Sequence, residues 1–581
     1  MKDHFIISKS KNKLSGKHQL ELTSLWSLNV SGDSYIEYNR DGVKIIIFGD
    51  CIGTKEELFE ISSDRIPTLR GNFYAIVVQK ESIKIYNSFL SVLPIYYTSD
   101  FEYISSSIEY ILEQSDKKFE IDKKFILESL LFNYGFFNRT LYSGIELVPS
   151  NCFLELSNDK FAIRKHFETT SLFTQKPTKG FRVADQISDL FIETTKNYFP
   201  DSSFDIAFTS GFDGRTLVSC ATHFDKSFNT FSFGKLENDD VAIPKSNAKA
   251  LGIPYQYFDL ENEEYLQEHY IKNATEYATL FPGGNGLIYS HFLYSTKQIS
   301  KNSEYLLSGV IGSELFRALH ITGAVTSQSL VDVFTSTTAE EIRDKISNAK
   351  PLQAINKKDF EVELDELIDE LIQYKQSIPD HLTENQQFYI FVFEEIFRKF
   401  FGQWIYIQMK YIKVRTPFLD YTFIKELLKT QYAGANNDFF TENPFKRMKG
   451  QYIYADIIKK TNKNIYYQKT GKGYRPKDIR ETLYGFNIIM PFIKKKLKRK
   501  VKRVNLDNLG IVSGSLEQRK IFKKNIKDTD WVNQQYLVDL LDHFSPYTNE
   551  KERDTLLMSI SLIRALQKKP ITKSEKTATN E

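Results

Sequence analysis

Short apolar and β-branched runs, separated by Gly, Asn, Asp and Ser, characterise the first part of the chain. The clearest are VKIIIFGD (43–50), GNFYAIVVQ (71–79), SIKIYNSF (82–89) and CFLEL (152–156). Runs of this kind, bounded by turn residues, are typical of β-strands. They predict a mostly antiparallel sheet domain that ends near Phe167, followed by a polar linker over 169–180.

The period changes after this linker. In FRVADQISDLFIETTKNYF (181–199) the apolar positions are Val183, Ile187, Leu190, Phe191 and Ile192. This spacing predicts an amphipathic helix.

Strand and helix patterns then alternate. The order is strand FDIAFTS (204–210), helix RTLVSCATHF (215–224), strand NTFSFG (229–234), helix DVAIPKSNAKALG (240–252) and strand PYQYFDL (254–260). Alternation of this kind predicts a parallel, doubly wound sheet. Past Asn262 the pattern is mainly helical, with LSGVIGSELF (307–316) as a further strand-turn-helix.

Composition narrows the class of protein. With 581 residues, the chain exceeds what one core usually holds, so two or more domains are expected. Hydrophobic content of 41% and charged content of 26% are ordinary for a globular protein. The net charge of +3 is too small to argue for nucleic acid as a partner.

The lack of a recognisable targeting segment and the scattered cysteines favour a cytoplasmic protein. The start, MKDHFIISKSKNK, lacks the apolar segment of a signal peptide, and no run approaches the ~20 apolar residues of a membrane span. Cys51, Cys152 and Cys220 lie far apart and form no metal-ligand spacing. Scattered free thiols fit a reducing compartment.

The turn FTSGFDGRT (208–216) is the strongest candidate for chemistry. It joins a strand to a helix at the carboxyl end of the predicted sheet, where such folds bind ligands. Small residues let a phosphate approach the backbone N–H groups and the positive end of the helix. Asp213 would then hold Mg²⁺, and Arg215 would meet phosphate or a carboxylate. The residues alone leave open a plain turn that needs Gly for geometry and Asp as a cap.

This turn resembles the pyrophosphatase-type loop of the asparagine synthetase family, usually written Ser-Gly-Gly-x-Asp-Ser. In a gapless alignment the five matched positions are Thr209, Ser210, Gly211, Asp213 and Gly214. Other stretches resemble family segments in the same order: TFSFG (230–234), SGVIGSELF (308–316) and VRTPFLDYTFIKELL (414–428).

The first part resembles the glutaminase-like domain of the same family. The matching stretches are LRGNFYAIVV (69–78), SVLPIYYTSDFEYISSSIEYIL (91–112) and TLYSGIELVPSNCFLEL (140–156). The resemblance implies a fold of mixed α/β and α+β class. An N-terminal antiparallel Ntn-hydrolase-like sandwich (1–168) would precede an adenine-nucleotide α-hydrolase-like parallel sheet with many added helices (181–545). A polar tail (570–581) is expected to be disordered.

Two departures from the family pattern concern its chemistry. Lys2 stands where a glutamine-hydrolysing member has its nucleophilic Cys, and Cys51 is the first cysteine. We therefore expect no glutaminase chemistry, as in family branches such as β-lactam synthetase and lasso-peptide cyclase. In the second loop the family's metal-binding Asp falls on Ser313 and the preceding Glu on Val310. Glu314 either supplies the missing carboxylate or only pairs locally.

A lysine-bearing loop and an earlier charged helix add further candidates. YYQKTGKGYRP (466–476) resembles the family loop whose Lys neutralises phosphate charge, with Lys472, Lys469 and Arg475 as candidates. At least two of these three are expected to be solvated charges on a turn. On the helix before PFLD, Glu394 and Glu395 could supply a general base or form surface ion pairs, and Arg398 and Lys399 could face the site.

The resemblance implies an ATP-dependent amide ligase that forms an acyl-AMP and needs ATP and Mg²⁺. The implied metal ligands are Asp213 and Glu314, and the implied catalytic residues are Lys472, Lys469 and Glu314. The implied nucleotide-binding residues are Thr209, Ser210, Gly211, Asp213, Gly214, Arg215, Ser232, Gly234 and Gly309.

The expected partners are a small-molecule or peptide carboxylate and an amine, without nucleic acid. The basic amphipathic stretch FIKKKLKRKVKRV (492–504) predicts a docked helix with a solvated basic face. The less favoured alternatives are a site for an acidic partner and a site for a membrane surface. Two alternatives to the ligase stay open: an enzyme acting on tRNA or another nucleotide, and a degenerate homologue that serves as a binding or scaffold protein.

Overall fold

The computed structural model describes residues 3–9, 16–158, 160–174, 176–317, 325–437, 449–481, 487–491, 493–494, 516–545 and 548–567. The predicted tail 570–581 and nearly all of the basic stretch 492–504 lie outside the described residues.

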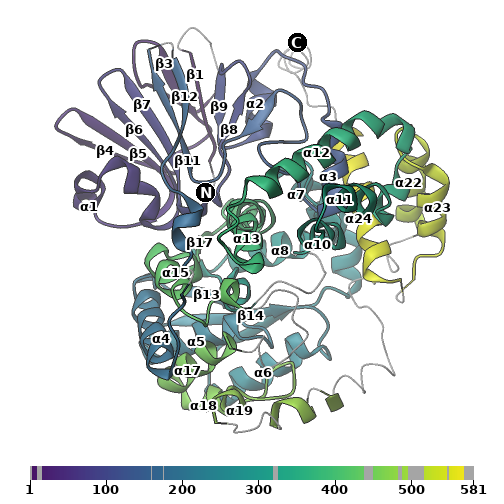
Figure 1. Ribbon diagram of the computed structural model, residues 1–581. Helices are drawn as coiled ribbons and strands as arrows, with labels where there is room; N and C mark the ends of the chain where they lie inside the picture. The colour runs from purple at the N-terminus through teal and green to yellow at the C-terminus, as the bar shows by residue number, and fades with distance from the viewer. Residues whose placement is uncertain are drawn as a thin grey trace.

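Two antiparallel sheets form the N-terminal part (Figure 1). In spatial order, the first sheet holds β10 (Ile145–Leu147), β8 (Tyr96–Thr98), β9 (Tyr103–Ser105), β1 (Phe5–Lys9), β3 (Trp26–Val30) and β2 (His18–Glu21). The second holds β12 (Lys160–Lys165), β11 (Cys152–Ser157), β7 (Ser82–Asn87), β6 (Arg70–Gln79), β5 (Val43–Ile52) and β4 (Tyr35–Arg40). The predicted antiparallel sandwich is confirmed.

Strand β5 shows why these sheets stack. Its side chains alternate between two buried clusters: Ile46 and Phe48 belong to the main core, whereas Ile45 and Ile47 belong to a smaller cluster on the opposite face. Phe5 of β1 packs on Phe48 with ring centroids 5.0 Å apart. Because both faces are covered, the strand reads as a continuous apolar run rather than a strict alternation.

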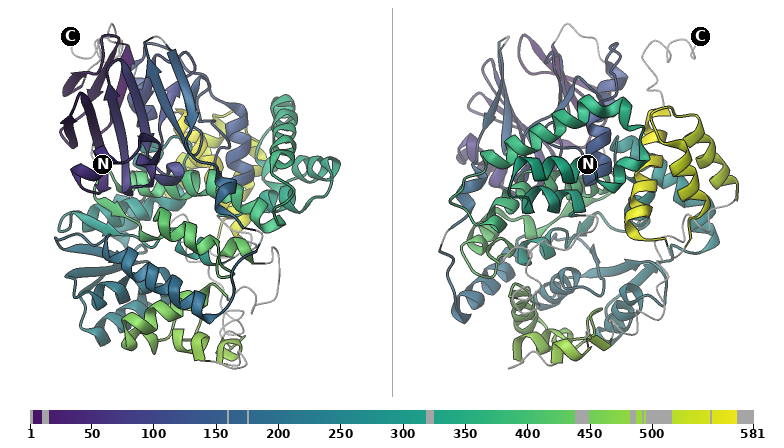
Figure 2. Two further views of the ribbon diagram at one scale, coloured as in Figure 1. Left: turned by 60° about the vertical axis from the view of Figure 1, so that its left-hand side comes forward. Right: turned by 45° about the vertical axis from the view of Figure 1, so that its right-hand side comes forward.

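A parallel sheet forms the centre of the C-terminal part, below the two antiparallel sheets in Figure 2. Its spatial order is β15 (Tyr255–Phe258), β14 (Phe228–Phe233), β13 (Phe204–Ala207), β16 (Tyr305–Leu307) and β17 (Lys413–Arg415). The chain runs outward from β13 through β14 and β15, then returns to add β16 and β17 on the other side. This reversal creates a switch point between β13 and β16, where doubly wound sheets bind ligands.

Helices flank the parallel sheet and extend beyond it. Those near the sheet are α4 (Phe181–Lys196), α5 (Asp213–His223), α6 (Asp239–Leu251), α9 (Gly312–Phe316), α15 (Tyr421–Leu428), α17 (Gln451–Thr461), α18 (Lys463–Tyr466) and α19 (Pro476–Glu481). Helices α4, α5 and α6 confirm the three predicted from periodicity.

The remaining helices make up the added region, which the sequence predicted to be mainly helical. They are α7 (Tyr270–Leu280), α8 (Gly286–Ile299), α10 (Gln328–Thr335), α11 (Ala339–Ser347), α12 (Glu361–Ser377), α13 (Glu384–Phe391), a π-helical turn (Val392–Phe401), α14 (Gly402–Gln408), α22 (Leu516–Lys527), α23 (Gln534–Asp542) and α24 (Glu550–Gln567). In the N-terminal part lie α1 (Lys55–Glu60), α2 (Ile108–Gln114) and α3 (Lys123–Phe132). Among the described residues, no helix combines the length and apolar character needed to span a bilayer.

Buried polar contacts join the N-terminal part to the parallel sheet. Asp50 of β5 accepts two hydrogen bonds from Arg415 of β17, at 2.7 Å from Nε and 3.2 Å from Nη2. Asn72 of β6 donates to the carbonyl of Val414 at 2.8 Å. Buried side chains of both parts belong to one continuous hydrophobic cluster. The two parts are therefore fixed against each other at β17, beside the switch point.

Candidate active site

Two loops meet at the switch point of the parallel sheet. The turn after β13 leads into α5, and the loop after β16 leads into α9. A Cβ on Gly309 would lie 2.8 Å from the Cβ of Asp213, and a Cβ on Gly214 would lie 2.1 Å from the carbonyl oxygen of Ala207. Both glycines are therefore needed for close packing of the two loops on the sheet. The gapless alignment gave Gly214 a phosphate-binding role, but its packing role is what the geometry supports.

The loop after β16 carries local backbone strain. Ile311 adopts a left-handed conformation with φ of 75° directly before α9, and its side chain is buried. A β-branched residue rarely adopts this conformation, which costs about 1–3 kcal/mol. Such strain clusters at functional sites and fixes the position of the next residues, including Ser313.

Asp213 lies at the centre of the two loops. Its Oδ2 accepts a hydrogen bond of 2.8 Å from the hydroxyl of Ser313, and its Oδ1 accepts one from the hydroxyl of Tyr454 on α17. Burial raises the pKa of Asp213, while these two donors and the positive charges of Arg317 and Lys472 lower it. Asp213 thus links α5, α9 and α17 through its two oxygens.

Glu314 lies next to Ser313 but faces a different partner. Its carboxylate is buried, and the guanidinium of Arg317 lies 3.8 Å away. Burial raises the pKa of Glu314 to about 7, against the opposing effect of Arg317. The hydroxyl of Tyr389 contacts the backbone carbonyls of Glu314 and Arg317 at 2.6 Å each. This network holds the first turn after the strained loop.

The turn 209–211 is held from two sides. Asp240, at the start of α6, accepts hydrogen bonds from the backbone N–H of Ser210 at 3.2 Å and from its hydroxyl. The carbonyl of Ser210 accepts a hydrogen bond of 3.0 Å from the N–H of Gly471. Gly211 is exposed, with its N–H 3.3 Å from the hydroxyl of Thr209. Gly211 is thus the part of the turn that a ligand can approach.

Arg215 is fully buried in the first turn of α5. Its Nε donates to the carbonyl of Gly211 at 3.3 Å, and its Nη2 donates to the carbonyl of Lys469 at 3.1 Å. With its amide oxygen turned toward the guanidinium, Asn247 accepts from both terminal nitrogens at 3.1 and 3.2 Å. Burial lowers the pKa of Arg215 to about 10. The residue joins the turn after β13 to the lysine-bearing loop.

The lysine-bearing loop therefore lies at the site. The loop contacts Ser210 and Arg215, and the charge of its Lys472 lowers the pKa of Asp213. Lys469 and Lys472 are exposed, whereas Arg475 pairs with Asp478 at 2.9 Å. Both predicted lysines are within the loop that packs on the turn, and Arg475 belongs to a local ion pair.

The two residues expected at the adenine lie at the end of β14. Ser232 is buried, and its hydroxyl shares a hydrogen bond with the hydroxyl of Tyr255. Gly234 has a φ of 126°, which favours glycine, and its N–H donates to the carbonyl of Phe258 at 3.0 Å. The backbone beyond β14 thus borders the same sheet edge as the turn 209–214.

Comparison with known proteins decides the family. Residues 201–484 match the family model for asparagine synthase. Residues 201–484 therefore form an asparagine synthase-type domain. This family uses ATP, so at family level the chain is an ATP-dependent, ligase-like enzyme. Comparison with curated protein sequences found no match. Among solved structures, glutamine phosphoribosylpyrophosphate amidotransferase from B. subtilis, complexed with ADP and GMP, is similar with 9% identity and a TM-score of 0.17, covering 60% of this chain and 83% of that chain.

A magnesium ion held by protein residues at this site would need free carboxylate oxygens. Both oxygens of Asp213 accept hydrogen bonds from hydroxyl groups, and Glu314 faces Arg317. Within the described part of the chain, no three His, Cys, Asp or Glu residues come together as a metal site. Mg²⁺ requires close to octahedral oxygen coordination with ionised ligands. The residues present therefore fit a protein-held magnesium ion poorly.

The charged helix before PFLD does not supply a general base to this site. Glu395 pairs with Lys399 at 2.6 Å and with Arg398 at 3.2 Å, and all three side chains are buried. Arg398 and Lys399 donate to the carbonyl of Phe137 at 2.6 and 2.5 Å, and Glu394 accepts from Thr169 at 2.7 Å. The expectation that these residues face the site was wrong, and so was the alternative of surface ion pairs. They fix the N-terminal part to the π-helical turn.

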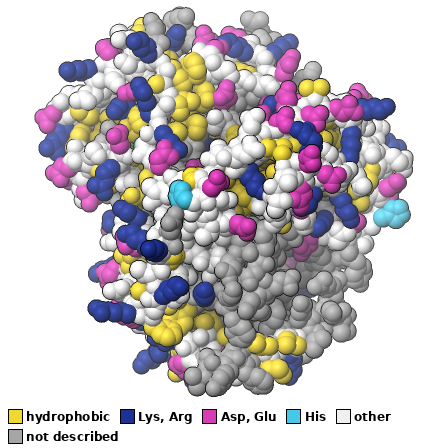
Figure 3. All heavy atoms as spheres, in the orientation of Figure 1, with side chains coloured by type: hydrophobic (Ala, Val, Ile, Leu, Met, Phe, Trp, Pro, Cys, Tyr) yellow, Lys and Arg dark blue, Asp and Glu magenta, His cyan; other side chains and the backbone are white. Residues whose placement is uncertain are grey.

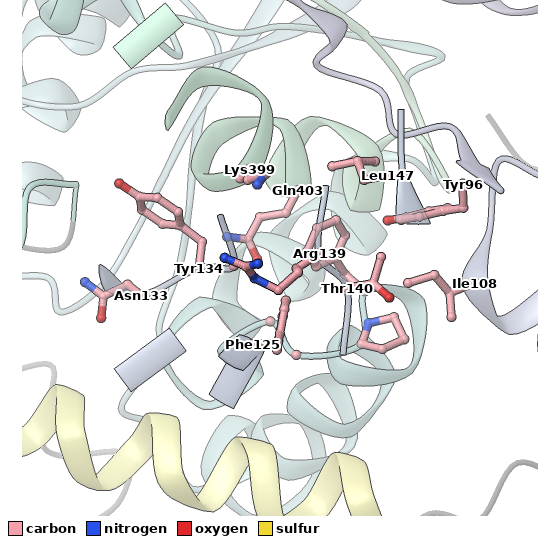
Figure 4. Close-up of a pocket in the computed structure, with 15 residues that line it drawn as sticks. Tyr96, Ile108, Phe125, Asn133, Tyr134, Arg139, Thr140, Leu147, Lys399 and Gln403 are labelled. Atoms are coloured by element: carbon pink, nitrogen blue, oxygen red, sulfur yellow. The ribbon is translucent and has the colours of Figure 1, made fainter. Parts of the chain in front are cut away.

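Lys399 instead lines a small cavity between the two parts of the chain. Figure 4 shows its amine beside Gln403 and Arg139, with Phe125 and Tyr134 among the walls. The cavity measures about 30 Å³, which holds about two water molecules. Arg139 pairs with Glu128 and with Glu370, so the cavity is part of a compensated ionic interface.

None of the three cysteines resembles an activated nucleophile. Burial raises the pKa of Cys51 to about 12, and it also raises the pKa values of Cys152 and Cys220. A thiolate nucleophile requires a lowered pKa. The interpretation of Cys51 and Cys152 as small packed side chains agrees with this environment.

Several residues at the site escaped the sequence reasoning, namely Asp240, Asn247, Arg317, Tyr389 and Tyr454. Asp240 and Asn247 lie on the predicted helix 240–252, which carries no family motif, and the other three lie outside the motif stretches. The acidic pair Asp239-Asp240 at the start of the predicted helix was the one available signal, because a carboxylate there can bond to a neighbouring turn.

Proposed function

We propose that this member of the asparagine synthetase family is an AMP-forming amide ligase without a glutaminase of its own. It would activate a substrate carboxylate with ATP and transfer the acyl group to ammonia or to the amine of a larger substrate. The match over 201–484 together with the turn 209–214 at the switch point is the observation that carries the proposal.

The reaction proceeds in two steps. A carboxylate oxygen of the substrate attacks the α-phosphorus of ATP, the bond to the β,γ-pyrophosphate breaks, and an acyl-AMP forms. An amine nitrogen then attacks the acyl carbon, AMP leaves with the bonding electron pair, and the nitrogen loses a proton to give the amide. The first step makes a good leaving group out of an oxygen that is a poor one.

The chain's own residues act mainly by electrostatics and positioning. The exposed backbone of Gly211 and the α5 N-terminus, whose N-cap Phe212 makes no side-chain cap, would receive the pyrophosphate. Lys472 and Lys469 would neutralise the pyrophosphate as it leaves. Gly234 and the end of β14 would border the adenine. Magnesium would reach the site as part of the nucleotide complex rather than on a protein carboxylate.

ATP–pyrophosphate exchange tests this proposal. Incubation with candidate carboxylic acids and labelled pyrophosphate should return label to ATP only with the correct acid, and added amine should then release AMP. Lys472→Met should lower exchange at least tenfold, and the control Lys477→Met should leave it unchanged. Absence of both exchange and AMP release across amino acids, peptides and sugar acids would reject the ligase.

A specific observation keeps a second function in view. Ser313 replaces the family's metal-binding Asp, and its hydroxyl is bonded to Asp213. A degenerate member that binds nucleotide, or serves as a scaffold, would share these features. Nucleotide binding without exchange for any acid would favour it over the ligase.

A further inference from the structure

Among the described residues, the hydrogen-bond partners of the buried cation Arg215 are all neutral groups. Its side chain is fully buried, and it donates to two backbone carbonyls and to an amide. Within the described ranges no Asp or Glu pairs with its guanidinium. A buried charge is costly unless an opposite charge compensates it, and a bound anion would provide that charge here. The carbonyls it holds belong to Gly211 and Lys469, which flank the proposed phosphate position.

A carboxylate is missing at the same site. Ser313 stands opposite Asp213, and the two are joined by a hydrogen bond of 2.8 Å. Tyr454 occupies the other oxygen of Asp213. Compared with a site of two acidic metal ligands, this one has lost a negative charge at residue 313 and contains a fixed positive charge at residue 215.

We infer that Arg215 supplies a fixed positive charge at the phosphate site of this chain, and that the site binds the triphosphate without a metal held by the protein. The inference rests on the proposed ATP-dependent function and specifies its electrostatics. Asp213 is then a structural acceptor that joins α5, α9 and α17, rather than a metal ligand.

The contacts of Arg215 explain how a cation that a ligand does not touch can act. By donating to the carbonyls of Gly211 and Lys469, it fixes the backbone of the turn against that of the lysine-bearing loop. Its charge also adds to the positive end of α5, in a buried environment where charges are screened little. Arg215 is therefore a positioning residue whose charge favours an anion at Gly211.

Isothermal titration with ATP, in EDTA and in excess Mg²⁺, tests the inference. The wild-type affinity should change less than threefold between the two conditions. Arg215→Met should weaken binding at least tenfold in both, and Arg215→Lys should recover most of the loss because it restores the charge. Arg564→Met is the matched control, since burial also lowers the pKa of Arg564 and its guanidinium bonds to Thr275.

Ser313→Asp provides a second variant in case Arg215→Met does not fold. A second carboxylate beside Asp213 should weaken ATP binding at least tenfold in EDTA, and Mg²⁺ should restore it. The inference is overturned if wild-type affinity falls tenfold or more in EDTA, or if folded Arg215→Met binds like wild type. Binding that requires Mg²⁺ contradicts this inference alone, whereas no ATP binding in either condition rejects the proposed function as well.

Discussion

The hydroxyl of Ser313 donates a hydrogen bond of 2.8 Å to Oδ2 of Asp213, across the switch point between β13 and β16. The bond joins the first turn of α5 to the first turn of α9. Tyr454 completes the arrangement from α17 by donating to Oδ1. A position that in a metal site would be a pair of repelling carboxylates is here a closed hydrogen-bond network.

Removal of one donor should therefore destabilise the ligand-free protein. Tyr454→Phe leaves an oxygen of Asp213 without its donor, and loss of a hydrogen bond to a charged group costs about 1.5–3 kcal/mol. Urea denaturation in EDTA measures the change in free energy of unfolding. Tyr467→Phe, at a residue 52% exposed, is the control and should be neutral. Equal stability of the two variants would contradict the network.

Glu314 predicts a pH dependence. Burial raises its pKa from 4.5 to about 7 in the folded protein, so the folded state binds a proton that the unfolded chain releases. The free energy of unfolding therefore falls as pH rises between these values. Above the folded pKa, the full cost of keeping the ionised carboxylate buried is present. Glu314→Gln removes the cost of burying this charge, so the stability of the variant relative to wild type should increase by about 2–3 kcal/mol from pH 5 to pH 8. Denaturation at both pH values checks this, and a constant difference would speak against a raised pKa.

The ion pair between Asp50 and Arg415 should contribute to the stability of the junction between the two parts. Their side chains are 8% and 11% exposed, so Asp50→Ala leaves a buried guanidinium unpaired and should cost about 3–5 kcal/mol. A double-mutant cycle with Arg415→Met should show that the double variant is less destabilised than the sum of the single ones. Additive effects would mean that the pair is not coupled.

The thiols predict the absence of glutamine hydrolysis. Because burial raises the pKa of all three cysteines, native protein at pH 7.5 should react slowly with iodoacetamide, and urea should expose all three. Mass spectrometry reads the labelling. We expect free ammonia or an amine substrate, but not glutamine, to support amide formation. Fast labelling of native Cys51 together with glutaminase activity would contradict this.

Local patterns predicted the parts of the fold that repeat a simple period. Strands β13 to β15 and helices α4 to α6 were predictable because each carries its own apolar spacing and turn residues. The short strand β17 was not, because three residues show no period and its partner β16 is distant in sequence. The antiparallel strand β1 was also not singled out, although Phe5 lies in the core.

The candidate site also has a part that could be predicted from sequence and a part that could not. The turn 209–214 is a continuous motif, so it could be predicted from sequence. The partners of Asp213 could not, since Tyr454 is 241 positions away and comes from a helix with no motif. Arg215 was predicted to contact phosphate or a carboxylate directly, whereas in the fold its side chain is buried against backbone carbonyls. Side-chain direction within a turn is set by packing, which residue order does not specify.

The surface gives little additional signal for a partner. On the upper part of the face in Figure 3, acidic and basic side chains are interspersed. The predicted basic stretch 492–504 lies almost entirely outside the described residues, so its partner stays a prediction.

The most direct test of the account is a crystal structure of the protein with a non-hydrolysable ATP analogue. The β- and γ-phosphates should contact the backbone of 209–211, near Lys472, with Asp213 still bonded to Ser313 and Tyr454. Phosphates bound elsewhere on the molecule, with this turn empty, would contradict it.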